Sequence, residues 1–140
     1  MPHNCIISGW GATQLYPPQY PKIQRWAQVK IWKEKWCRAF VGQNLISETV
    51  CAGNSEEFGA RTCHGDSGGP LACVHNIGGN DAMVLVGVTR SGLFDCMSTD
   101  NRRTPSFFTR VSQYVDWIKQ YMVIANCLLF TYQTLYQVYY

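Results

Sequence analysis

The stretch Cys63-His64-Gly65-Asp66-Ser67-Gly68-Gly69-Pro70 decides how the rest of this chain is interpreted. A serine hydroxyl is a poor nucleophile unless a base takes its proton and hydrogen-bond donors receive the charge that develops on the attacked carbonyl oxygen. Glycines on both sides of Ser67 let the backbone bend sharply and leave no Cβ in the way of a substrate. The pattern therefore favours a nucleophilic serine over the alternative, a glycine-rich turn that merely contains serine.

A glycine-flanked serine also occurs in the nucleophile elbow of α/β-hydrolases, where the turn joins a strand to a helix and the acid and histidine follow in sequence. Here Gly68-Gly69-Pro70 follows the serine, and glycine and proline both disfavour a helix. His75 is the only histidine downstream of Ser67. The elbow is therefore excluded.

Outward from this stretch, short segments have the character of strands. Ala27, Val29 and Ile31 alternate with larger or polar neighbours, which is the period of a strand. Three prolines within residues 17–21 predict a loop without regular structure. The other strand candidates are residues 4–8, 49–52, 71–74, 82–88 and 107–110. Residues 33–40 are a candidate short helix.

The pattern changes near the end of the chain. Val111, Val115, Ile118 and Met122 recur at the spacing of one helix face, with Ser112 near the helix start. Short strands followed by one terminal helix predict an all-β domain, either a small antiparallel barrel or a sandwich.

The chain has seven cysteines, which suggests either metal ligands or disulfides. No Cys-x-x-Cys pair occurs, and His3, His64 and His75 do not fall at the spacings of zinc ligands. Disulfides in an oxidising compartment are therefore favoured, and the odd number leaves at least one thiol over. We expect a secreted protein, although the first residues do not resemble a signal peptide.

Composition excludes several functions. With 46% apolar and 15% charged residues, the chain is not typical of a disordered segment, and its net charge of +3 is mild. No Lys/Arg run or basic-aromatic pattern indicates nucleic-acid binding. Residues 123–140 are apolar and aromatic, but Asn126, Gln133 and Gln137 interrupt them, so a membrane span is not expected.

The octet around Ser67 resembles the active-serine segment of the trypsin/chymotrypsin family of serine proteases. Other landmarks of that family follow in the same order along the chain. They are the segments Cys5-x-x-Ser8-Gly9-Trp10-Gly11, Cys51-Ala52-Gly53, Leu85-Val86-Gly87-Val88, Phe108-Thr109-Arg110-Val111 and Tyr114-Val115-Asp116-Trp117-Ile118. The resemblance covers residues 4–122. It implies the second six-stranded antiparallel β-barrel of the family with its C-terminal helix, and a missing first barrel.

Several residue roles are implied by this resemblance. Ser67 is the expected nucleophile, and the Gly65 and Ser67 N–H groups form the expected oxyanion hole. Asp66 is expected to pair with an amino terminus freed by activation. The implied disulfides are Cys5–Cys73, Cys37–Cys51 and Cys63–Cys96, which leaves Cys127 unpaired. No metal or cofactor is expected.

The histidine and aspartate that activate the serine in this family precede it by long stretches. Here His3 and His64 precede Ser67, and Asp66 beside it is the only earlier aspartate. We expect His64 at the rim of the pocket, not in the position of the base. The chain by itself is therefore expected to be inactive, with its missing partners on the first barrel.

The expected substrate pocket departs from the trypsin pattern. Arg61 and Thr62 stand where the pocket floor is expected, and an arginine there would repel basic side chains. We favour Arg61 turning to solvent or pairing with a carboxylate such as Asp95 or Asp100. Further expected pocket residues are His64, Arg90, Ser91, Gly92 and Ser106, and the serine at 106 is expected to narrow the pocket.

We expect a peptidase domain over residues 1–122 and an apolar extension of unknown role over residues 123–140. Two functions are considered for this domain. The first is a serine endopeptidase whose partners are protein or peptide substrates or inhibitors. The second is a non-catalytic homologue that binds proteins.

Overall fold

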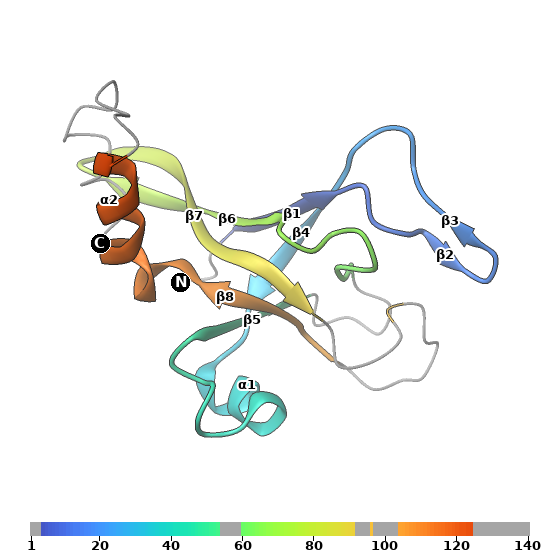
Figure 1. The fold of residues 1–140 in the computed structure, drawn as a ribbon, viewed down its shortest axis with the longest axis horizontal. Helices are drawn as coiled ribbons and strands as arrows, with labels where there is room; N and C mark the ends of the chain where they lie inside the picture. The colour runs from blue at the N-terminus through green and yellow to red at the C-terminus, as the bar shows by residue number, and fades with distance from the viewer. Residues whose placement is uncertain (1–3, 54–59, 92–95, 97–103, 125–140) are drawn as a thin grey trace.

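A closed barrel of six antiparallel strands forms the centre of the computed structural model, which describes residues 4–53, 60–91, 96 and 104–124 (Figure 1). Around the barrel the strand order is β1-β4-β5-β8-β7-β6. The sequence left barrel and sandwich open, and the fold confirms the barrel that the family resemblance implies. The strands are β1 Cys5–Gly9, β4 Arg25–Ile31, β5 Thr49–Gly53, β6 Pro70–Ile77, β7 Asn80–Ser91 and β8 Ser106–Arg110.

The remaining elements lie outside the barrel. The predicted helix is present as α1 Glu34–Val41, and the terminal helix as α2 Val115–Ile124. A 3₁₀ turn, η1 Val111–Gln113, precedes α2, so the helix begins later than the periodicity predicted. Residues 17–21 are not wholly irregular, because β2 Gln14–Leu15 pairs with β3 Pro18–Gln19. None of the described helices has the length and apolar character to cross a bilayer.

The barrel interior is filled by alternate residues of its strands. Along β4, Ala27 and Val29 face inward while Gln28 and Lys30 are exposed, as the alternation predicted. Burying one large apolar side chain stabilises the fold by about 1.5–3 kcal/mol. The core consists of Cys5, Ile7, Val29, Val50, Ala52, Leu71, Cys73 and Phe108.

Close packing in this core requires a glycine on β7. A Cβ on Gly87 would lie 2.7 Å from Cβ of Phe108, which is fully buried on β8. Real Cβ atoms do not approach so closely. Gly87 therefore lets β7 and the Phe108 side chain meet inside the barrel.

A second cluster packs α1 against the outside of the barrel. Cys37 of α1 is buried and disulfide-bonded to Cys51 of β5, and Ile46 and Phe107 complete the cluster. On the exposed side of the helix, Arg38 pairs with Glu34 one turn earlier. The disulfide and the buried cluster together fix α1 to the β5–β8 side.

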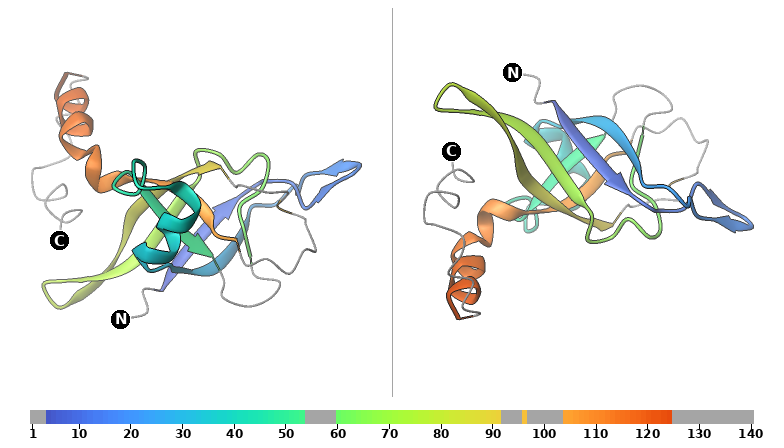
Figure 2. Two further views of the ribbon diagram at one scale, coloured as in Figure 1. Left: turned by 90° about the horizontal axis from the view of Figure 1, so that it is seen from below. Right: turned by 90° about the horizontal axis from the view of Figure 1, so that it is seen from above.

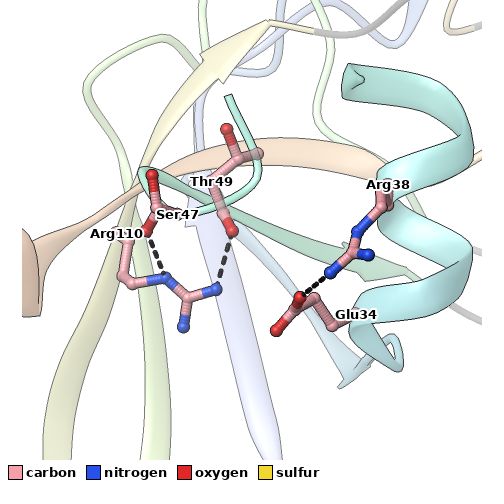
Figure 3. A network of polar contacts seen from close by, with 5 residues as sticks. All are labelled: Glu34, Arg38, Ser47, Thr49 and Arg110. Atoms are coloured by element: carbon pink, nitrogen blue, oxygen red, sulfur yellow. Dashed lines mark hydrogen bonds and ion pairs between the residues drawn. The ribbon is translucent and has the colours of Figure 1, made fainter. Parts of the chain in front are cut away.

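Arg110, at the end of β8, ties the loop before β5 to the barrel (Figure 3). Its guanidinium donates from Nε to the Ser47 carbonyl and from Nη2 to the Thr49 carbonyl, both at 2.9 Å. Its backbone N–H also donates to the Glu48 carbonyl at 2.8 Å. One side chain thus satisfies two carbonyls where the loop enters the sheet.

The β6–β7 hairpin extends beyond the barrel, and α2 leaves the barrel in a different direction (Figure 2). Gly78 and Gly79 form the turn with φ of 59° and 92°, values that L side chains rarely adopt. Asn76 accepts a hydrogen bond from the Gly79 N–H and donates one to Asp81. These contacts define the register of the hairpin from its tip.

Three disulfides are present, and they are the pairs that the family resemblance implies. Cys5–Cys73 joins directly paired positions of β1 and β6. The second is the Cys37–Cys51 bond beneath α1, and the third joins Cys63 to Cys96 across 33 residues. Cys127 lies outside the described residues.

Candidate active site

Ser67 lies exposed at the tip of a tight turn that leads into β6. Gly65 and Gly68, on either side of it, have φ of 98° and 83°. A side chain at either position would strain the backbone. Gly69 faces a different constraint, because a Cβ there would lie 2.8 Å from the Asp66 carbonyl oxygen and 3.1 Å from that of Ser8. The three glycines are thus each required by this bend.

Backbone hydrogen bonds fasten the turn to the end of β7. The Gly68 N–H donates to the Thr89 carbonyl at 2.9 Å, and the Thr89 N–H donates to the Gly69 carbonyl at 2.8 Å. The Asp66 N–H donates to the Cys63 carbonyl at 3.0 Å. In the part of the chain that the structure describes, the N–H groups of Gly65 and Ser67 donate to no backbone carbonyl.

The Asp66 carboxylate turns inward and accepts two backbone hydrogen bonds. The Gly11 N–H donates to Oδ1 at 2.8 Å, and the Cys63 N–H donates to Oδ2 at 2.9 Å. The carboxylate lies directly against the backbone of Gly9 and Gly11, so closely that a Cβ on either glycine would overlap it. The Gly9-Trp10-Gly11 segment therefore forms the seat of Asp66.

An open cavity of about 300 Å³ lies beside this carboxylate. Among the described residues that line it, Asp66 contributes the only carboxyl group, and Arg25 and Arg61 contribute guanidinium groups. The other walls come from the end of β1, the start of β4 and two loop segments. They are residues 7–9, 11–13, 25–27 and 60–62.

The expected pocket floor is joined to the residues that precede and begin β8. Thr62 and Ser106 are both buried, and the Thr62 N–H donates to Ser106 Oγ at 3.0 Å. Arg61 is half-buried and donates from Nη1 to Thr104 Oγ1 at 3.2 Å. Arg61 thus has a hydroxyl group as a partner and does not face solvent alone. Asp95 and Asp100, the carboxylates expected to pair with it, lie outside the described residues.

His64 and His75 are the two histidines in the described part of the chain. His64 is exposed, and its carbonyl accepts a hydrogen bond from the Ala12 N–H at 2.8 Å. His75 lies on β6, opposite Ala82 of β7. His3 lies outside the described residues.

The remaining expected pocket residues lie at the end of β7. Arg90 is exposed, and Ser91 is paired in register with Phe107 of β8. Gly92 lies outside the described residues. Within those residues, no group of three or more His, Cys, Asp or Glu side chains is placed to hold a metal ion.

Four residues of this site were not identified from the sequence as contacts of the turn or of Arg61. Gly9 and Gly11 were noted only as a landmark, although the recurrence of glycine beside a tryptophan was a signal of close backbone approach. Thr89 and Thr104 contribute through a backbone pair and a hydroxyl, and neither residue has a sequence pattern that marks it.

The fold and the site together define a six-stranded antiparallel barrel that presents a serine on a glycine-rich turn. The sequence matches the protein family described as Trypsin over residues 1–118. This chain belongs to the trypsin family.

Similar proteins include Kallikrein-8 of Rattus norvegicus, 40% identical over 120 residues that make up 85% of this chain and 41% of the relative. Kallikrein-8 of Homo sapiens is 39% identical over 118 residues, 84% of this chain and 40% of the relative. The Drosophila melanogaster Spaetzle-processing enzyme is 33% identical over 117 residues, 81% of this chain and 28% of the relative. The chain therefore spans less than half the length of these relatives.

A solved structure with the same fold is that of neuropsin, described as a serine protease expressed in the limbic system of mouse brain. It superimposes with a TM-score of 0.65 at 35% sequence identity. The match covers 86% of this chain and 48% of neuropsin. The trypsin-like barrel predicted from the sequence is thus confirmed by a solved relative.

Proposed function

We propose that this chain carries the nucleophile half of a secreted serine endopeptidase, with Ser67 attacking the scissile carbonyl to form an acyl-enzyme. The observation that carries the proposal is the clamp on Asp66, whose two backbone hydrogen bonds hold the turn while Ser67 stays exposed. A preorganised turn of this kind stabilises the developing oxyanion without reorganising during the reaction.

The Gly65 and Ser67 N–H groups are the proposed donors to that oxyanion. Their neighbours Asp66, Gly68 and Gly69 each use their own N–H within the fold. Donors that receive the charge of the transition state are worth about 10²–10³ in turnover each. The cavity beside Asp66 is the proposed place for the amino terminus that this carboxylate would pair with.

We place the general base and its orienting acid on a first barrel that precedes residues 1–122 in the longer protease, the length of the relatives being consistent with this. Removing the histidine of a serine protease triad lowers turnover about 10⁶-fold. The isolated chain is therefore expected to be inactive. Residues 123–140 lie outside this peptidase unit.

The surface available for the first barrel is the outward side of four neighbouring strands. Trp26 on β4, and Met83 and Leu85 on β7, are exposed apolar side chains, and Ile6 and Ala72 are half-buried between them. The register places Leu85 opposite Ala72 and Ala72 opposite Ile6, so an apolar row crosses β7, β6 and β1. On β4 the residue opposite Ile6 is Gln28, and Trp26 lies opposite Ser8. An apolar strip of this extent is typical of a protein interface.

The same strip supports a second candidate, a non-catalytic homologue that binds other proteins. Arg61 favours it modestly, because a guanidinium at the expected pocket floor is an unusual basis for a trypsin-like site. The substrates or inhibitors of the first candidate, and the partners of the second, would be proteins or peptides.

A fluorophosphonate probe, which labels activated serines, tests the proposal. We expect no labelling of the isolated chain, and labelling of Ser67 when a polypeptide carrying a trypsin-family first barrel is bound to it. Ser67→Ala is the matched control and must abolish the label. Stoichiometric labelling of the isolated chain would refute the inactivity, and a stable two-barrel complex that stays unlabelled would favour the binding protein.

A further inference from the structure

The net charge of this chain is concentrated in one short segment. Residues 30–38 contain four Lys or Arg residues and one Glu, so they carry a net charge of +3. The rest of the chain contains eight Lys or Arg and eight Asp or Glu residues, which balance each other. A local excess of one sign of charge attracts ligands of the opposite sign. The basic residues of this segment, called the basic patch below, are Lys30, Lys33, Lys35 and Arg38.

The basic patch lies where β4 leads into α1 (Figure 1). Lys30 is exposed near the end of β4, next to the buried Val29, and Lys33 directly precedes α1. The length of the chain limits the Cα atoms of Lys30 and Lys33 to a separation of about 11 Å, and those of Lys33 and Lys35 to about 7 Å. These separations are close to the Debye length of about 8 Å at physiological ionic strength. The charges therefore act on a ligand together.

The helix α1 turns its apolar side to the barrel and its basic side outward. Cys37 is buried, and Phe40 packs with the same cluster. At 3.6 residues per turn, Lys35 and Ala39 point away from Cys37, and both are exposed. The disulfide between Cys37 and Cys51 fixes this orientation. Lys35 is therefore presented to solvent on a helix that cannot rotate freely.

Three of the four charges in the basic patch are not neutralised by the described part of the chain. Arg38 pairs with Glu34. The side chains of Lys30 and Lys33 form no hydrogen bond or ion pair with any described residue. Nζ of Lys35 lies 5.3 Å from the ring centroid of Trp36, and this contact leaves its positive charge in place. The three lysines thus remain available to an anionic ligand.

The exposed side of α1 distinguishes between classes of polyanion. A helix that binds a membrane surface buries an apolar face in the lipid, whereas α1 packs its apolar residues on the barrel. Single-stranded nucleic acids stack successive bases on several aromatic rings. Among the described residues of α1, Trp36 is the one large apolar side chain that is exposed, and Lys35 lies over its ring. A ligand recognised by its charge alone fits this surface better than either.

The three disulfides favour an extracellular protein. Sulfated polysaccharides are the abundant linear polyanions outside cells. We propose that the basic patch binds a sulfated polysaccharide, with the ammonium groups of Lys30, Lys33 and Lys35 pairing with sulfate groups along the sugar chain.

This site is separate from the surfaces used by the proposed peptidase. The apolar row proposed for the first barrel crosses β7, β6 and β1, and Trp26 lies at the opposite end of β4 from Lys30. The turn that carries Ser67 leads into β6, while α1 is fixed to the β5–β8 side. Polysaccharide binding therefore leaves both surfaces free, and it does not depend on whether Ser67 is active.

Binding of a heparin octasaccharide to the full chain, measured by isothermal titration calorimetry at several salt concentrations, tests the proposal. Each cationic contact releases counterions, so Lys35→Gln should reduce the slope of log affinity against log salt by roughly one. The double variant Lys33→Gln/Lys35→Gln should bind about tenfold or more weakly. Lys119→Gln removes an exposed lysine from α2 instead and should change neither quantity. Equal affinities for the double variant and the unaltered chain would overturn the proposal.

Two further comparisons separate charge from folding and sulfate from other anions. Lys33→Arg/Lys35→Arg keeps both charges and should bind as tightly as the unaltered chain. If it loses as much affinity as the glutamine pair, charge is not what binds the ligand, and the proposal fails. Vesicles of phosphatidylcholine and phosphatidylserine, and a single-stranded oligonucleotide of the same charge as the octasaccharide, should bind more weakly than heparin. Equal or tighter binding of either would assign the basic patch to that class of ligand and overturn the proposal.

Discussion

Replacing Gly9 with alanine should dislodge Asp66 from its seat. A Cβ on Gly9 would lie 3.0 Å from Cγ of Asp66 and closer still to Oδ1, so the carboxylate must move. It would then lose the hydrogen bonds from the Gly11 and Cys63 N–H groups. Hydrogen bonds to charged groups contribute about 1.5–3 kcal/mol each, so the free energy of unfolding should fall by about 3–6 kcal/mol.

A double-mutant cycle measured by urea unfolding, with the disulfides intact, isolates this contact. In an Asp66→Ala background, the nearest remaining atom is Cβ of residue 66 at 3.6 Å, an ordinary contact. Gly9→Ala should therefore cost little there. Gly53→Ala is the matched control, because a Cβ at Gly53 meets nothing closer than 3.6 Å. If Gly9→Ala lowers the free energy of unfolding equally in both backgrounds, the proposed contact between Gly9 and the Asp66 carboxylate is refuted.

Other substitutions test the barrel itself. Gly87→Ala should lower the free energy of unfolding by about 1–3 kcal/mol through overpacking against Phe108, measured as a lower urea midpoint at unchanged slope. Arg110→Met should cost about 1–3 kcal/mol, because two loop carbonyls lose their donor, and an unchanged midpoint would contradict this. Replacing both Cys5 and Cys73 with serine should cost about 4 kcal/mol, since their bond closes a loop of 68 residues. A loss below 1 kcal/mol would mean that the reduced chain is already ordered.

The strands of the barrel were predictable because local patterns and the fold agree, whereas their closure into a barrel was implied only by the family resemblance. The alternation through Ala27 and Val29 marks a strand with one buried face, and the structure places both inside the barrel. The start of the terminal helix was less predictable. Val111 is buried and fits the helical spacing, but it belongs to the 3₁₀ turn that leads the chain from β8 into α2. The spacing of apolar residues indicates which face is buried, but it does not distinguish an α-helix from a 3₁₀ turn.

The turn around Ser67 was predictable from its glycines, whereas the contacts that support it were not. The positive φ angles of Gly65 and Gly68 follow from the residue type at a sharp bend. The bonds between Thr89 and this turn involve only backbone atoms, so any residue other than proline at 89 would form them. The partner of Arg61 was missed for a related reason. Thr104 contacts Arg61 across 43 positions of the sequence, so no local pattern marks the pair.

The two hydrogen bonds between residues 61–62 and residues 104–106 tie together two distant segments of the expected pocket floor. A substitution at Ser106 that removes its hydroxyl would leave the buried Thr62 N–H without an acceptor, a penalty of about 1–3 kcal/mol. Changes in specificity should therefore arise by paired replacement on both segments. Libraries that vary one segment alone would sample mostly destabilised variants.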